Sequence, residues 1–328
     1  MSEKNGLLSS GLGMVGRNKR YICWFYLLNL GLAWLGVAAF RDQVGGILDR
    51  SLVADRLLHG FDISVFAEMM ARPEFGPASS ASMSAMHFAL LFFVATALFL
   101  PGVFQGYAST YRLPRTEFFR ACGQNLWRFI RLMIVAGIVM GIVAAALFGA
   151  NGAIVKKAGD STNEMLSFEL QMLGLFVIFL VMTVLRIWFD LAEADTVLND
   201  QRAVRKSIAA GFRHTFRSLG SLLGSYLVTT LGAAIILVGG LWCWMRFVPS
   251  ASVAGAWIVG QLTLLLLLIP RFWQRGIAVA YWKQKMLIPV SVVEPIIVPQ
   301  VVQPVIVPVV PEPIPSEIPN LPPAPQES

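Results

Sequence analysis

Four charged side chains lie close together where the fourth long apolar segment of the chain ends. They are Arg186, Asp190, Glu193 and Asp195. Spacings of four and three residues place the first three on one face of a helix, where Arg186 and Asp190 can form an ion pair. Charges inside a hydrocarbon core are costly and often mark transport or proton-transfer sites, whereas charges at the membrane surface need only a structural role. The sequence predicts a polar site here, with the structural role favoured.

Other residues with chemical potential do not form recognisable motifs. The three histidines are scattered: His59, His87 and His214. The glycines of a GxGxxG pattern, Gly11, Gly13 and Gly16, have only ten residues before them, too few for the strand that a dinucleotide site requires. Nucleotide, metal and serine-hydrolase signatures are missing from the sequence. We therefore expect no catalytic residue, no metal and no cofactor, and an enzyme is the function class with the least support.

The composition indicates which elements must position the charged site. Of the 328 residues, 56% are hydrophobic and 14% are charged, against roughly a quarter charged in soluble domains. The apolar residues form six blocks of about 20, enough to cross a hydrocarbon core of about 30 Å. The predicted spans are residues 21–40, 86–107, 130–150, 170–190, 222–245 and 251–270. The sequence predicts an all-α membrane protein with six transmembrane helices.

Basic residues predict the orientation of these spans. Of the 26 Lys and Arg residues, 18 lie before the first span, in alternate connections and after the last span. The first connection, residues 41–85, instead has four Arg against six acidic residues. The positive-inside rule then places both termini in the cytoplasm. The net charge of +7 is explained by topology and by anionic lipid headgroups, so no nucleic-acid partner is predicted.

Two basic segments have the pattern of amphipathic helices. They precede the third and fifth spans, and in the second of them Val204, Ile208, Phe212 and Phe216 recur every four residues. Such helices either lie in the headgroup plane of the membrane or pack on the protein's own cytoplasmic face. The predicted membrane-surface basic residues are Arg120, Arg128, Arg131, Arg205, Lys206, Arg213 and Arg217.

A short internal correspondence predicts three repeated units. The segments GYASTYR, DLAEADT and GIAVAYW follow the second, fourth and sixth spans and align Ala108, Ala192 and Ala278. Each unit would be a cytoplasmic amphipathic helix followed by a hairpin of two spans, with residues 7–20 as the first such helix. Oligomers also remain open, because glycine pairs at 137 and 141 and at 220 and 224 permit close approach between helices.

Three domains are predicted along the chain. Residues 1–20 form a cytoplasmic N-terminal segment, and residues 21–286 form the membrane domain. Its outer loop, 41–85, is expected to contain two short surface helices, with Asp62 as an N-cap. The last 42 residues hold 12 of the 18 prolines and no Lys or Arg. Residues 287–328 are therefore predicted to be a disordered cytoplasmic tail, acting as a spacer or as a ligand for a protein partner.

The segment from Arg186 to Arg217, RIWFDLAEADTVLNDQRAVRKSIAAGFRHTFR, resembles uncharacterised bacterial six-span membrane proteins. It is similar, more loosely, to the membrane domain of some glycerophosphodiester phosphodiesterases, without their hydrolase domain. In that pattern an aspartate ends the fourth span and a basic helix leads into the fifth, positions held here by Asp190 and Arg205. The resemblance implies a bacterial inner membrane and no enzymatic activity.

Two functions follow from these features. The first is a non-catalytic scaffold that organises lipids or partners at its basic surface. The second is a transporter or permease with a polar site near the cytoplasmic end of span four, for which Pro101 in the second span and the charged group at 186–195 are the motivating features. A polar cavity reaching the membrane midplane would favour the transporter, and a closed bundle would favour the scaffold.

Overall fold

The predicted all-α architecture is confirmed. The computed structural model describes residues 6–48, 64, 80–159, 164–249 and 252–286. These residues form eight α-helices and one π-helical turn, and none of them belongs to a β-strand. The elements are α1 (Leu7–Arg17), α2 (Lys19–Leu48), α5 (Ser80–Ala108), α6 (Arg115–Gly159), α7 (Glu164–Leu198), α8 (Val204–Arg217), α9 (Leu219–Phe247), α10 (Val253–Tyr281) and η2 (Trp282–Met286).

Six of these helices, α2, α5, α6, α7, α9 and α10, are long and apolar enough to cross a membrane. The six predicted spans are therefore confirmed, although the helices are longer than the apolar blocks. Helix α6 has 45 residues and is about 68 Å long at 1.5 Å per residue. Because a hydrocarbon core is about 30 Å thick, much of α6 must extend beyond it. Its first turns, Arg115–Arg131, carry four arginines and are the part suited to water.

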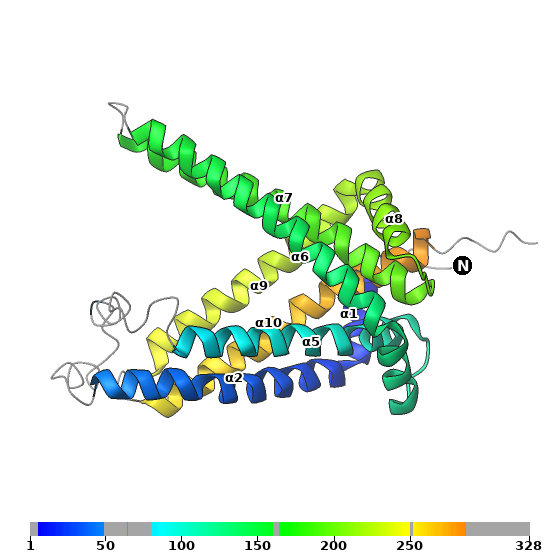
Figure 1. Ribbon diagram of the computed structural model, residues 1–328, viewed down its shortest axis with the longest axis horizontal. Coiled ribbons are helices and arrows are strands. Elements are labelled where there is room, and N and C mark those ends of the chain that lie inside the picture. The colour runs from blue at the N-terminus through cyan, green and yellow to red at the C-terminus, as the bar shows by residue number, and fades with distance from the viewer. Residues whose placement is uncertain (1–5, 49–63, 65–79, 160–163, 250–251, 287–328) are drawn as a thin grey trace, which may run out of the picture. The chain divides into compact units, whose positions relative to one another are not determined.

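The spans pair as three consecutive hairpins, α2 with α5, α6 with α7, and α9 with α10 (Figure 1). The helical segment that precedes each hairpin packs on the last helix of another hairpin. The start of α6 contacts α5, α8 contacts α7, and α1 contacts α10. Contact between the first and the last of these helices closes the series into a ring of three units.

The breaks that follow α1 and α8 have nearly the same backbone geometry. Asn18 has φ −119° and ψ 38°, and Ser218, 200 residues later, has φ −128° and ψ 31°. At each break a backbone N–H bonds back into the preceding turn, and the next helix starts at once. Helix α6 runs through the equivalent region without a break. The first and third units are therefore alike in backbone as well as in sequence pattern.

Glycines allow close contact between helices at positions other than the predicted pairs. A Cβ atom on Gly276 of α10 would lie 2.7 Å from the carbonyl oxygen of Gly11 in α1. A Cβ atom on Gly211 of α8 would lie 2.8 Å from the carbonyl oxygen of Trp188 in α7. By contrast, no atom of the described residues outside their own helices lies within 4 Å of such a position at 137, 141, 220 or 224. The close approach that these glycines permit is therefore not made among the described residues, and a contact in an oligomer stays a prediction.

The buried core lies at one end of the helices, which we call the basic end. It comprises α1, α8, Arg115–Arg131 of α6 and the last turns of α5, α7 and α10, and hydrogen bonds such as Trp273 Nε1 to the Leu8 carbonyl oxygen (2.9 Å) connect them. The largest fully buried side chains include Tyr21, Phe104, Tyr107, Phe118, Phe129, Tyr226, Phe272 and Tyr281. Most of the predicted outer loop and the whole predicted tail lie outside the described residues.

Candidate functional site

The four predicted site residues lie in the last turns of α7, at the basic end. Asp190, Glu193 and Asp195 are buried, with 8%, 8% and 5% of their surface exposed. The Arg186 side chain is 36% exposed and forms an ion pair with Asp190, with 3.8 Å between Nε and Oδ2. Burial of three carboxylates on one helix is unusual, since an ionised carboxylate needs partners when water is removed.

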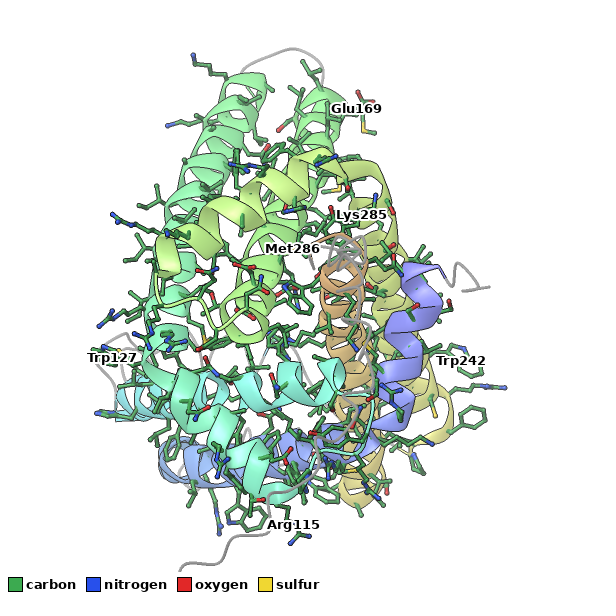
Figure 2. All side chains as sticks on the ribbon, turned by 90° about the vertical axis from the view of Figure 1, so that its right-hand side faces the viewer. Arg115, Trp127, Glu169, Trp242, Lys285 and Met286 are labelled. Atoms are coloured by element: carbon green, nitrogen blue, oxygen red, sulfur yellow. The ribbon has the colours of Figure 1, made fainter. Side chains whose placement is uncertain are left out.

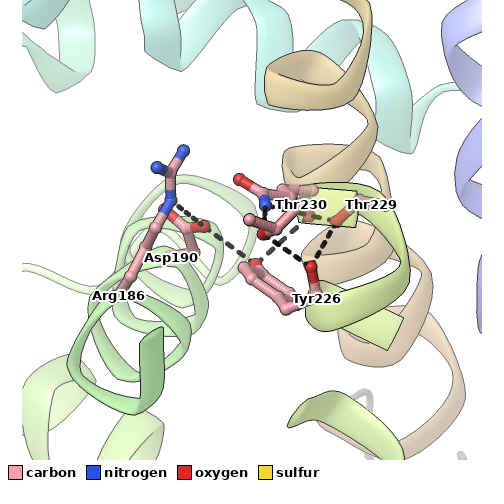
Figure 3. Close-up of polar contacts among 6 residues, drawn as sticks. Arg186, Asp190, Tyr226, Thr229 and Thr230 are labelled. Atoms are coloured by element: carbon pink, nitrogen blue, oxygen red, sulfur yellow. Dashed lines mark hydrogen bonds and ion pairs between the residues drawn. The ribbon is translucent and has the colours of Figure 1, made fainter. Parts of the chain in front are cut away.

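Tyr226 supplies the principal partner of Asp190. Its side chain projects from α9 and is 1% exposed, and its hydroxyl lies 2.8 Å from Asp190 Oδ2 (Figure 3). The same hydroxyl lies 3.2 Å from the Gln274 carbonyl oxygen in α10. A phenol has one hydrogen, and the shorter distance and the carboxylate charge favour donation to Asp190. One buried tyrosine thereby joins α7, α9 and α10.

Gln274 and two threonines extend this network. Gln274 Nε2 donates to Thr229 Oγ1 and to Thr230 Oγ1, both at 3.2 Å. Each threonine hydroxyl in turn donates to the Tyr226 carbonyl oxygen at 2.8 Å, and Figure 3 shows Thr229 and Thr230 beside Tyr226. The two amide hydrogens and both hydroxyl hydrogens therefore have acceptors, so the side-chain donors of this network are satisfied internally.

Arginines of α10 balance the two carboxylates of α7. Arg275 attracts both Glu193 and Asp190 electrostatically, and Arg271 attracts Asp190. The Arg275 Nε atom is buried and has no hydrogen-bond partner in the described part of the chain. With Arg186, three arginines thus lie near the carboxyl groups of Asp190 and Glu193. Charges compensated in this way cost much less free energy to bury than isolated ones.

Asp195 faces a different neighbour. Its Oδ1 atom accepts a hydrogen bond of 2.6 Å from Asn199 Nδ2, and its charge acts on His214 of α8. Burial lowers the pKa of His214, the charges of Arg217 and Arg213 lower it further, and Asp195 opposes this shift. The structure therefore brings Arg186, Asp190 and Glu193 together, whereas Asp195 belongs to the α7–α8 contact.

Sequence reasoning missed the α9 and α10 members of this cluster. Tyr226 lay inside a predicted span, where its hydroxyl had no visible partner. Gln274 and Arg275 followed the predicted end of span six at residue 270 and were interpreted as a cytoplasmic connection. The correspondence of DLAEADT with GIAVAYW was the available signal, because it places the last turns of α10 at the level of Asp190.

The predicted surface basic residues lie mainly where water or headgroups can reach them. Arg120, Arg131, Arg205, Lys206, Arg213 and Arg217 are exposed. Arg128 is half-buried and forms an ion pair with Asp200, and the Arg131 guanidinium stacks over the Trp127 ring at 5.1 Å. Figure 2 shows Trp127 and Arg115 projecting away from the ribbon.

Helix α8 packs through small residues and leaves its aromatic residues outside. Ser207, Gly211 and Thr215 are its buried residues, at the spacing of four that defines one helix face. Phe212 and Phe216 are 46% and 53% exposed. The predicted apolar face of this helix is thus not covered by the described part of the protein at its C-terminal half.

Comparisons with known proteins gave no match, whether with protein-family models, with curated proteins or with solved structures. Fold and site together define a multi-pass helical membrane protein with a closed charged cluster at one end of its bundle. Within the described residues, no group of three or more His, Cys, Asp or Glu side chains is placed to hold a metal ion.

Proposed function

We propose that this chain is a non-catalytic membrane protein that binds anionic phospholipids along its basic end and organises lipid or protein partners there. The observation that carries the proposal is the outer surface of α8. Exposed Phe212 and Phe216 share that surface with Arg205, Lys206, Arg213 and Arg217. Aromatic rings with flanking cations suit the boundary between headgroups and acyl chains.

The closed state of the charged cluster supports a scaffold over a transporter. Asp190, Tyr226 and Gln274 are 8%, 1% and 7% exposed, and they bond to one another and to neighbouring threonines. Three grooves in the described residues are lined mainly by apolar side chains, and none includes Asp190 or Glu193. Such a cluster ties three helices together, and these three grooves do not reach it.

Neutralising α8 tests the proposal. The full chain and the variant Arg205→Gln/Lys206→Gln/Arg213→Gln/Arg217→Gln are placed in nanodiscs containing phosphatidylglycerol and phosphatidylcholine. Each basic residue near an anionic surface contributes about 1 kcal/mol, so the variant should lose phosphatidylglycerol enrichment around the protein, measured by lipid analysis. Lys156→Gln/Lys157→Gln is the control, because these exposed lysines lie at the other end of α6. Unchanged enrichment in the α8 variant would contradict the proposal.

We further propose that the basic end faces the cytoplasm of a bacterium, with the proline-rich tail on the same side. The alternation of basic connections supports this orientation. A fluorescent protein that matures only in the cytoplasm, fused after Ser328, should fluoresce. If deleting residues 287–328 removes a co-purifying protein, the tail binds a partner; if all partners remain, it is a spacer.

A transporter is the second candidate, favoured by the buried and unpartnered Arg275 Nε atom beside Glu193. Solute flux in proteoliposomes that falls in Asp190→Asn and Glu193→Gln, with the fold intact, would support it. If flux is unchanged in both variants, these residues do not form a transport site.

A further inference from the structure

A groove with a volume of about 620 Å³ lies between α2, α5 and the first turn of α6. Its size is within the range of about 300–1,000 Å³ that is usual for ligand sites. Six aromatic side chains line it: Tyr21, Trp24, Phe25, Phe99, Phe118 and Phe119. Those of α2 follow one another at helical spacing and so share one face. The groove is separate from α8 and from the charged cluster.

Ring contacts hold the aromatic wall in place. Phe118 stacks on Tyr21 with ring centroids 5.3 Å apart and meets Trp24 edge-on at 5.5 Å. Phe99 meets both Phe25 and Phe119 edge-on at 6.4 Å. Because these rings come from three helices and support one another, the groove is largely formed before any ligand arrives.

The mouth of the groove is cationic. Arg115 lines it, is exposed, and has no ion-pair partner among the described residues. The guanidinium of Arg20 lies 5.0 Å from the Tyr21 ring and donates to the Leu113 carbonyl oxygen at 2.5 Å. The nearby carboxylate, Glu117, accepts a hydrogen bond of 3.1 Å from the Tyr111 hydroxyl. Arg115 therefore keeps its donors available for an anion.

The other end of the groove leads onto an apolar surface. Leu27 forms its edge and is 61% exposed. Trp34 and Leu35, two turns further along α2 and on the same face, are 77% and 59% exposed. A ligand that fits both ends must have an anionic head and a long apolar chain.

We propose that this groove binds one anionic phospholipid, with its phosphate on Arg115 and one acyl chain against the aromatic wall. A guanidinium can give a phosphate two parallel hydrogen bonds, and the exposed face of α2 lets the chain continue into the bilayer. The proposal goes beyond the general binding surface of α8, because it names a single site with its own headgroup contact and acyl-chain contact.

Two substitutions with matched controls test the two halves of the site. The purified full chain in detergent is titrated with dioleoyl phosphatidylglycerol, and bound lipid is counted by native mass spectrometry. Arg115→Gln should weaken the tightest binding event about fivefold, which corresponds to ~1 kcal/mol. Arg112→Gln is its control, because Arg112 is also exposed but does not line the groove. Leu27→Trp should weaken binding by filling the edge, and Leu231→Trp, at an equally exposed position on α9 outside the groove, should not.

The results separate this site from general attraction of lipid. Equal effects of Arg115→Gln and Arg112→Gln would overturn the proposed site. Displacement of the bound lipid by millimolar inorganic phosphate would also overturn it, because either result shows that charge alone attracts the lipid. Unchanged lipid binding in Leu27→Trp would contradict the proposed acyl-chain contact. The α8 quadruple variant should retain the tight event. If that variant leaves lipid enrichment unchanged while Arg115→Gln still weakens binding, the proposal of lipid binding along α8 is contradicted and the proposal of a lipid site in the groove is supported.

Discussion

The basic end and the far end of the bundle use apolar side chains in opposite ways. At the basic end, Phe104, Phe129 and Phe272 are no more than 1% exposed and pack among helices from all three units. Towards the far end, the same residue type is exposed, as at Phe148 (53%) and Phe176 (58%). The far halves of the hairpins thus make few contacts beyond their own pair, and lipid must cover them. The helices therefore pack against one another at the basic end, whereas lipid hydrocarbon surrounds them at the far end.

Truncation of one phenylalanine at each end should give the largest difference in stability between the two ends. Phe129 and Phe148 both lie on α6, so the helix and the chemical change are the same. Phe129→Ala removes a fully buried ring and should cost ~3–5 kcal/mol in unfolding free energy, because a cavity remains. Phe148→Ala should cost far less, since lipid or detergent fills the space. Thermal unfolding in detergent measures both, and similar losses of stability would break the comparison.

Substitution of a closely packed glycine at the basic end should give the second-largest loss of stability. Gly276→Leu would force a side chain against the Gly11 carbonyl oxygen, which is backbone and cannot rotate away. Overpacking of this kind should destabilise the protein by ~3 kcal/mol or more, and α1 should detach from α10. Gly141→Leu, in the open part of α6, is the control and should leave the melting temperature nearly unchanged. Proteolysis between α1 and α2 would report the detachment, and equal stability of both variants would contradict it.

Removal of a single oxygen tests the charged cluster. Tyr226→Phe keeps the ring but leaves Asp190 without its 2.8 Å donor, and a buried carboxylate that loses a hydrogen bond costs ~1.5–3 kcal/mol. The control is Tyr26→Phe, because Tyr26 bonds to neutral, half-buried Gln261 at 3.1 Å. That change should cost less than ~1.5 kcal/mol. If urea unfolding ranks the two variants in the opposite order, Asp190 has another partner or is neutral.

The same contrast explains what sequence alone could predict. Long apolar runs such as Leu264–Ile269 identify spans regardless of their neighbours, because insertion depends on the residues within each helix. The hydrogen bond between Tyr26 and Gln261 joins residues 235 positions apart, and neither local sequence identifies the partner. Contacts between units, such as Gly11 with Gly276, depend on which faces meet across 265 residues of chain, and no local pattern encodes that. The GxxxG spacing at 137–141 has the same limit, because it permits a close contact without specifying the partner.

The pH dependence of stability gives the smallest effect and is confined to the basic end. Burial lowers the pKa of His214 below that of the unfolded chain, about 6.5. Between the two pKa values the unfolded state binds more protons, so stability should rise with pH through this range and fall as the pH drops below about 6.5. His214→Gln should flatten this part of the pH–stability curve. The charges facing His214 are Arg213, Arg217 and Asp195, so Asp195→Asn should lower its pKa further, and the loss of stability below about pH 6.5 should become larger and extend to lower pH. Melting temperatures from pH 5 to 8 measure this, and a curve for His214→Gln that parallels the parent chain would show that other groups set the dependence.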